Sequence, residues 1–171
     1  FKSTGDSKKD AMLRLIRQIN LLIKACSTPN YMPGYLSDNI PTKTSNIVNM
    51  IGSMPDEKVA IGCTTIEALQ MYVDVLSDRF FGCPSFVIDG SIAFKKREKI
   101  IKDFEASFNG ILICTQQSLK SSVNIPTCNQ VIMEALQWNI PKMEQFYFRF
   151  IRLDSNDHTT VHFINYVGTI E

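Results

Sequence analysis

Short apolar runs recur along the chain, and polar or turn-forming residues bound each of them. Such runs are typical of strands buried in a sheet. They predict strands at residues 58–63, 85–88, 111–113, 131–133 and 159–167. The last of these is rich in β-branched and aromatic residues, which favour strands.

Between these runs, apolar residues return at helical spacing. They predict helices at residues 10–26, 44–54, 64–80 and 94–108, and a further helix that begins near Pro141. Thr64 and Glu67 have the spacing of a capping box at the start of the third helix. The fourth helix is expected to bury Phe94, Ile101, Phe104 and Phe108. Strands that alternate with helices predict a parallel α/β sheet.

The polar side chains of residues 110–153 are the strongest candidates for a function. The apolar run at 111–113 is followed by Cys114-Thr115 and then by polar residues, so the strand should end there. In open parallel sheets, ligands gather at the carboxyl ends of strands. At about 100° per residue, Gln145, Arg149 and Arg152 would share an arc of roughly 60° on the last helix, opposite its apolar side. A plain solvated helix face would have the same pattern.

The order and spacing of several motifs resemble those of one family. Gln145-x-x-x-Arg149-x-x-Arg152 resembles the last signature of superfamily-two helicases, Q-x-x-G/D-R-x-x-R. Residues 114–125 resemble the preceding signature, which in Swi/Snf proteins is approximately S-T-x-A-G-G-x-G-I-N-L. Trp138 and the segment 89–91 are similar to the D-W-N-P and D-G-S segments of those proteins. The chain therefore resembles the second RecA-like lobe of a Swi/Snf-type ATPase.

This resemblance implies a fold and a division of the chain. The fold would be a RecA-like three-layer α/β sandwich with a mainly parallel sheet, preceded by an N-terminal helix. Residues 1–41 would lead into the lobe and residues 42–171 would form it. The lobe would belong to an ATP-dependent DNA translocase or helicase-like protein.

The resemblance also implies roles for individual residues. Arg152 would be the arginine finger, Arg149 its phosphate-contacting companion, and Gln145 the glutamine that orders this face. The positions that would contact nucleic acid are Thr115, Asp89, Gly90, Ser91, Asn124 and Trp138. ATP and Mg²⁺ would be bound mainly by a first lobe, because the sequence contains no G-x-x-x-x-G-K-[ST] loop. The implied partners are duplex DNA and that N-terminal RecA-like lobe.

The sequence departs from the family pattern at two places. Ser118, Leu119, Ser121 and Ser122 replace the paired glycines, and Phe148 stands before the first arginine, where the family has a small or acidic residue. A degenerate lobe that serves as a nucleic-acid or protein interaction module is therefore the alternative function. We expect no ATP hydrolysis from this chain by itself.

Other features leave alternatives open. Ser91 could cap the following helix instead of contacting DNA. The ridge formed by Lys95, Lys99 and Lys102 could be a solvated face, in which Lys102 pairs with Glu98, or a phosphate contact. A third function would make Cys114 a nucleophile with His158 or His162 as its base, although nothing in the sequence brings a histidine near.

Composition narrows the class of protein. The chain has 171 residues, 44% hydrophobic, with a formal net charge of +1, which suits one globular domain and excludes a strongly basic nucleic-acid-coating protein. It has no apolar run of the roughly 18 residues that a membrane span needs.

Its five widely spaced cysteines predict free thiols in a reducing intracellular compartment, and we expect no metal site. That compartment would be the cytoplasm in a prokaryote or virus and the nucleus in a eukaryote. Because it starts at Phe1, we expect the chain to be a fragment.

Overall fold

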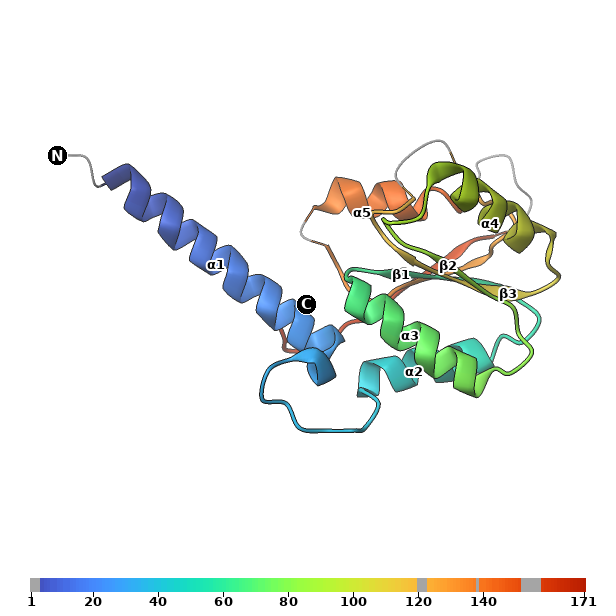
Figure 1. Cartoon of the computed structure of the whole chain (residues 1–171), viewed down its shortest axis with the longest axis horizontal. Helices are drawn as coiled ribbons and strands as arrows, with labels where there is room; N and C mark the ends of the chain where they lie inside the picture. Colours follow the sequence, from blue (N-terminus) through green and yellow to red (C-terminus); the bar gives the residue numbers. More distant parts are fainter. Residues whose placement is uncertain (1–3, 120–122, 138, 152–157) are drawn as a thin grey trace.

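The computed structural model describes residues 4–119, 123–137, 139–151 and 158–171, with side chains from residue 8 onward. The helices are α1 (Thr4–Ser27), the 3₁₀ helix η1 (Pro29–Tyr31), α2 (Thr42–Gly52), α3 (Ile66–Arg79), α4 (Phe94–Ala106) and α5 (Ile140–Tyr147). The strands are β1 (Lys58–Cys63), β2 (Ser85–Ile88), β3 (Gly110–Thr115), β4 (Gln130–Met133) and β5 (Thr160–Phe163). Figure 1 shows their arrangement.

The five strands form one parallel sheet in the order β2-β3-β1-β4-β5. The central strand β1 pairs with β3 and β4, so Ile61 lies beside both Ile113 and Ile132. Every residue of β3 is buried, which explains its continuous apolar run, because helices cover both faces of a parallel sheet. The predicted strands are confirmed, although β5 is shorter than the predicted 159–167.

Helices cover both faces of this sheet, with α2 and α3 on one face and α4 and α5 on the other (Figure 1). The first face buries Ile47, Ile51, Leu69, Tyr72 and Leu76. The second buries Ile101, Phe104, Met143, Phe146 and Phe150. The predicted three-layer, RecA-like α/β sandwich with an N-terminal helix is therefore confirmed.

The N-terminal helix α1 extends away from the sandwich and meets it only at its C-terminal end (Figure 1). The predicted helix is present, but it starts at Thr4 rather than near residue 10. Its apolar stripe is exposed, with Met12 at 65%, Leu15 at 55% and Leu22 at 52%. Helical spacing therefore identified the helix correctly, while the side chains that create the spacing do not pack on this domain.

Three local predictions on α3 and α4 are wrong. Thr65, not Thr64, caps α3, because its side chain accepts a hydrogen bond from the Ala68 amide at 3.1 Å. Phe94, at the start of α4, and Phe108, just beyond its end, are 53% and 81% exposed, so the buried residues of α4 are Ile101 and Phe104 in its second half. Glu98 and Lys102 do not form an ion pair among the described side chains.

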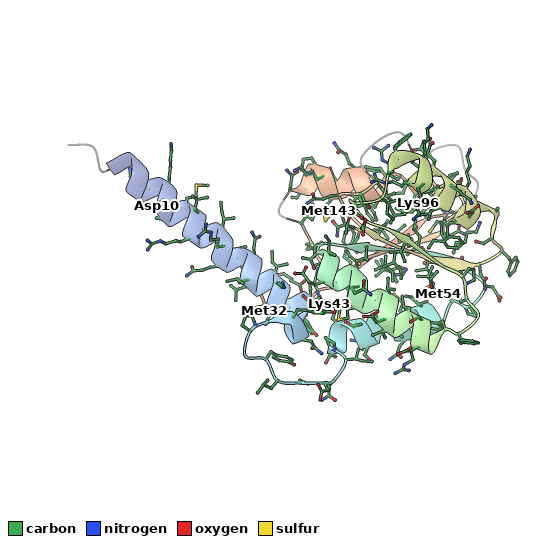
Figure 2. All side chains as sticks on the ribbon, viewed as in Figure 1. Asp10, Met32, Lys43, Met54, Lys96 and Met143 are labelled. Atoms are coloured by element: carbon green, nitrogen blue, oxygen red, sulfur yellow. The ribbon has the colours of Figure 1, made fainter. Side chains whose placement is uncertain are left out.

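A buried polar cluster around Lys43, which is labelled in Figure 2, joins α2 to the end of β4 and to the C-terminal segment. The Lys43 Nζ atom lies 2.5 Å from a Glu171 carboxylate oxygen and donates to the Glu134 carbonyl at 3.1 Å. The Tyr166 hydroxyl accepts a hydrogen bond from the Lys43 amide at 3.0 Å. The cluster therefore attaches the end of the chain to the first helix of the sandwich.

Candidate functional site

The carboxyl ends of β1, β2 and β3 lie side by side and open into a hollow of about 920 Å³, called here the carboxyl-edge hollow. Its lining includes Thr64, Gly90, Arg97, Thr115 and Gln117. Two residues predicted to contact nucleic acid, Gly90 and Thr115, therefore line one hollow although 25 positions separate them in the numbering. Thr115 is the last residue of β3, as predicted, and is 8% exposed.

Asp89, Gly90 and Ser91 form a tight turn after β2. The Asp89 carboxylate accepts hydrogen bonds from the Ser91 amide at 2.8 Å and from the Ser91 hydroxyl at 2.6 Å. These bonds hold the pKa of Asp89 below its usual range. Because Ala93 is the N-cap of α4, the alternative that Ser91 caps this helix is wrong.

Arg97 ties the loop after β2 to the loop after β3. Its guanidinium donates to the carbonyls of Ser118 and Asp89 and, at 2.9 Å, to that of Ile92. It therefore shapes the carboxyl-edge hollow, while the three predicted ridge lysines of α4 are exposed. Sequence analysis missed Arg97 because it stands in a basic run, where nothing separates it from its solvated neighbours.

Gln116 joins the carboxyl ends of three strands. It directly follows β3, and its Nε2 atom donates to the carbonyls of Gly62 at 3.1 Å and Ala135 at 3.0 Å, beside β1 and β4. The side chain is 4% exposed and contacts the position where Gly62 would carry a Cβ atom, which would lie 3.2 Å from its Cγ. Sequence analysis also missed this residue, because it occupies an unspecified position of the signature.

A second, smaller hollow of about 230 Å³ lies beside α5 and is called here the Gln145 hollow. Its apolar lining comes from Phe146 and Leu119, and its polar lining from Gln116, Gln117, Gln137, Lys142 and Gln145. Because Gln117 lines both hollows, the predicted glutamine of α5 and the predicted threonine of β3 lie on neighbouring parts of one edge.

The prediction that one helix carries both Gln145 and Arg149 is wrong. The helix α5 ends at Tyr147, and the Arg149 carbonyl accepts a hydrogen bond from the Ile125 amide at 2.7 Å. Arg149 is half-buried next to the loop that carries the exposed Asn124. Arg152 and Trp138 lie outside the described residues, so their assignments stay predictions.

The hypothesis that Cys114 is a nucleophile is wrong. Its side chain is fully buried, and burial raises the pKa of the thiol well above its usual range, which removes the reactive thiolate. His162 lies on β5, where a ring nitrogen is 2.9 Å from the Gln130 side-chain oxygen. Within the described ranges, no cluster of three or more His, Cys, Asp or Glu side chains could hold a metal ion.

The electrostatics of the carboxyl edge of the sheet depend on Glu134, which follows β4 and is fully buried. Burial raises the pKa of this carboxyl, while the nearby Lys43 ammonium opposes the rise. Its Oε2 atom accepts hydrogen bonds from the Thr64 hydroxyl at 3.2 Å and from the Thr64 amide at 3.4 Å. Glu134 therefore positions Thr64 at the rim of the carboxyl-edge hollow and explains why Thr64 is not the helix cap.

None of the helices in the described part of the chain is long and apolar enough to cross a membrane.

Comparison with known proteins identifies this architecture. The profile of the helicase conserved C-terminal domain family matches residues 42–154. The C-terminal part of the Fun30 ATPase domain has a similar structure, with a TM-score of 0.70 and 19% identity over 90% of this chain and 51% of that one. Domain 2 of the DEAD-box helicase Mss116p, solved with an RNA duplex, gives a TM-score of 0.62 and 20% identity over 71% and 49%.

The DEAD-box helicase Mss116 bound to single-stranded RNA and UDP-BeF gives the same TM-score and identity, and there the match covers 25% of the Mss116 chain. The chain thus spans about half of the first two structures and a quarter of the third. No curated protein sequence matches it. At these identities the structural similarity shows the fold.

Proposed function

Because the chain belongs to the helicase conserved C-terminal domain family, we propose that it is the C-terminal motor lobe of an ATP-dependent DNA translocase or helicase-like protein of the Swi/Snf type. The lobe would start at residue 42, and residues 1–41 would lead into it. One observation carries this proposal: Thr115 and Gly90 line the same carboxyl-edge hollow, and Gln117 connects that hollow with the one that Gln145 lines.

The family implies the use of ATP. The described residues fit a supporting role in ATP binding better than the main role. The Gln145 hollow offers side-chain amides and one cation, Lys142. The described part of the chain contains no carboxylate cluster that could hold Mg²⁺. A first lobe would therefore hold the phosphates and the metal. Arg152 would supply positive charge to the transferred phosphoryl group, an effect of about 10³ to 10⁵ in rate, with Arg149 beside it.

Duplex DNA is the proposed partner at the carboxyl-edge hollow. Thr115, the Asp89–Ser91 turn and Asn124 would contact the phosphate backbone, together with Trp138. Arg97 contributes positive charge to the lining of the hollow and the exposed lysines of α4 contribute it nearby, which favours phosphate binding, while Glu67 is the acidic residue of the lining. The cell compartment would be the cytoplasm or, in a eukaryote, the nucleus.

A second candidate function is a lobe that binds nucleic acid or protein without turnover. Phe148 favours it, because its ring is 54% exposed directly after α5, next to Arg149. A bulky aromatic side chain at this place could keep a first lobe from closing on the arginines.

The two functions differ in the response of the intact two-lobe protein to DNA. Under the motor hypothesis, Arg152→Ala and Gln145→Ala abolish or strongly reduce DNA-stimulated ATP hydrolysis, whereas Arg79→Ala, an exposed arginine at the other end of the sheet, does not. Thermal unfolding checks that each variant folds. Wild-type turnover in Arg152→Ala would refute the arginine-finger assignment. DNA affinity that does not change when ATP is added, together with no ATP hydrolysis by the wild-type protein, would support the interaction module.

A further inference from the structure

Glu67 places a carboxylate in the lining of the carboxyl-edge hollow, where it would repel a phosphate of bound DNA. Arg97 is the other charged residue of the described lining, and its guanidinium already donates to three backbone carbonyls. Asp89 stands next to Gly90 but outside this lining, where its carboxylate accepts hydrogen bonds from Ser91. A phosphate site that includes Glu67 therefore needs a cation that restrains this carboxylate.

Lys24, near the C-terminal end of α1, supplies that cation. Its Nζ atom donates a hydrogen bond to the Glu67 Oε1 atom at 2.7 Å. Among the described side chains, it is the one cation at ion-pair distance from Glu67. The hydrogen bond from Lys24 lowers the pKa of Glu67, so the carboxylate is ionised at neutral pH. Lys24 therefore balances a full negative charge beside the hollow.

The turn of α1 that carries Lys24 is fixed on the sandwich, although the rest of this helix extends into solvent (Figure 1). Ser27 and Thr28, at the end of this turn, are fully buried. The Thr28 amide and hydroxyl donate to the Lys24 carbonyl at 2.7 Å and 3.3 Å. The side chains of Lys24 and Glu67 are 27% and 39% exposed. The fold therefore holds the lysine beside Glu67, whereas the carboxylate would be free to rotate without it.

Lys24 lies beside the carboxyl-edge hollow but outside its described lining. It lines an adjoining hollow of about 310 Å³ between α1 and the sheet, called here the α1 hollow. Thr64, Thr65 and Gln117 line both hollows, so the two are neighbours. The ion pair therefore directs the Glu67 carboxylate toward α1, and Lys24 stands apart from the residues that are predicted to contact DNA.

We propose that Lys24 is a positioning residue for phosphate binding, because it neutralises the Glu67 carboxylate and holds it away from the DNA backbone at the carboxyl-edge hollow. This role rests on the proposed function, in which duplex DNA binds at that hollow. It also gives the docked end of α1 a task in the lobe. If the last turn of α1 moved away, Glu67 would lose its cation, and DNA binding would weaken with every contact residue still in place.

Fluorescence anisotropy with a fluorescein-labelled DNA duplex tests this role in the intact two-lobe protein, without nucleotide and at about 0.15 M salt, where the Debye length is about 8 Å. Lys24→Met should weaken binding at least about fivefold, because the released carboxylate repels phosphates. In the Glu67→Gln background, the same substitution should weaken binding less than about twofold, because salt screens the attraction between DNA and a lysine outside the lining. Lys24→Arg, which keeps the cation, should bind as the wild type does. Thermal unfolding checks that each variant folds.

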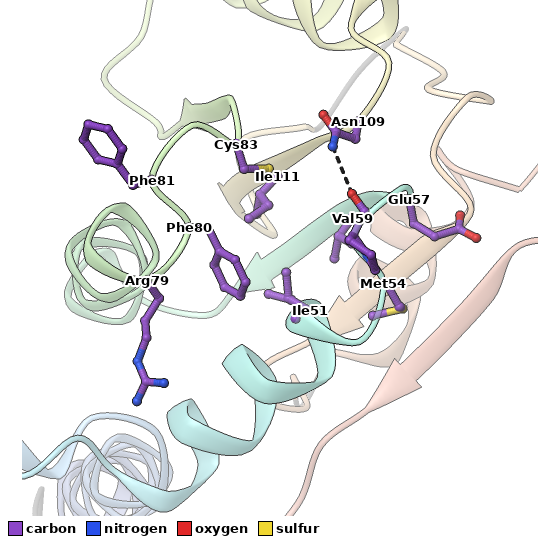
Figure 3. Close-up of a pocket in the computed structure, with 12 residues that line it drawn as sticks. Ile51, Met54, Glu57, Val59, Arg79, Phe80, Phe81, Cys83, Asn109 and Ile111 are labelled. Atoms are coloured by element: carbon purple, nitrogen blue, oxygen red, sulfur yellow. Dashed lines mark hydrogen bonds between the residues drawn. The ribbon is translucent and has the colours of Figure 1, made fainter.

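Two residues at the opposite end of the strands from Thr115 provide matched controls. Glu57 and Arg79 line a hollow of about 350 Å³ at the amino edge of the sheet (Figure 3). Glu57→Gln and Arg79→Met remove the same kinds of charge as the test variants. Each should change the DNA affinity less than about twofold.

Equal losses from Lys24→Met in the two backgrounds would overturn the positioning role, because Lys24 would then attract DNA by itself. No loss in the wild-type background would overturn it as well. Both results leave the proposed DNA contact standing, provided that the wild-type protein binds the duplex. A wild-type protein that does not bind duplex DNA would overturn the proposed function, and the role of Lys24 with it.

Discussion

The ion pair between Lys43 and Glu171 tests how the end of the chain stabilises the sandwich. The two side chains are 1% and 2% exposed, and 2.5 Å separates the Lys43 Nζ atom from the Glu171 Oε1 atom. Lys43→Met removes the ammonium and leaves a buried carboxylate without its cation. Breaking a buried pair in this way costs about 3–5 kcal/mol of unfolding free energy. At roughly 2–4 °C per kcal/mol for a domain of this size, the melting temperature should fall by about 6–20 °C.

A second substitution separates the loss of the Lys43–Glu171 ion pair from the loss of the other contacts of the Lys43 side chain. Glu171→Gln in the Lys43→Met background removes the isolated charge, so the double variant should be more stable than the sum of the two single losses predicts, by at least about 1 kcal/mol. Urea denaturation followed by circular dichroism measures all four proteins of this cycle. A strictly additive result would refute the view that the two groups interact directly.

An exposed ion pair in the same chain provides the matched control. Lys24 and Glu67 are 2.7 Å apart, but their side chains are 27% and 39% exposed. Lys24→Met should therefore cost only about 0–1 kcal/mol. The hydrogen bond from Lys24 lowers the pKa of Glu67, so this small contribution is present at neutral pH and is lost as the pH falls through that lowered pKa. If Lys43→Met cost as little as Lys24→Met, burial would not determine the strength of these pairs.

Two further predictions concern glycine substitutions at the carboxyl edge and the order in which the cysteines react. Gly62→Ala would place a Cβ atom 2.6 Å from the Phe146 ring and should destabilise the chain by about 1–3 kcal/mol in urea denaturation. Gly90→Ala meets no atom within 4 Å and should change stability by less than about 0.5 kcal/mol, so equal losses would contradict the predicted clash. N-ethylmaleimide at pH 8 should label Cys26 and Cys83 before Cys63, Cys114 and Cys128, because the last three side chains are buried. Burial raises the pKa of these three thiols, to about 12 for Cys128; it also raises the pKa of Cys83, which is only half-buried and stays accessible. Mass spectrometry that found Cys114 labelled as fast as Cys26 would contradict this order.

The layered fold could be predicted because its signals are local. A strand buried on both faces is a short apolar run, and β1, β3 and β4 have this pattern. Helical spacing likewise identified each α-helix of the described residues. Spacing did not reveal what each apolar side faces. Phe94 and Phe108 were expected to be buried and are exposed, and the apolar stripe that identified α1 is exposed too.

The details of the site could not be predicted because they depend on contacts between distant residues. Thr64 is not a helix cap because Glu134, 70 residues later, accepts hydrogen bonds from its amide and hydroxyl. The helix α5 ends before Arg149, whose carbonyl accepts a hydrogen bond from the amide of Ile125. A local pattern can place Thr115 at the end of a strand, but it cannot identify which loops the guanidinium of Arg97 joins.

Most candidate contact residues of the carboxyl edge are exposed and lie outside a buried layer of positioning residues, with Thr115, which is 8% exposed, as the exception. Glu134 and Gln116 are 0% and 4% exposed, and they fix Thr64 and the ends of β1, β3 and β4 through hydrogen bonds. The candidate contacts Ser91, Asn124 and Gln145 are exposed. Because removing a buried hydrogen-bonding partner leaves its neighbour unsatisfied, substitutions in the inner layer should reduce stability first. Substitutions in the outer layer should reduce binding or turnover and leave stability nearly unchanged, so the proposed function can be tested without unfolding the lobe.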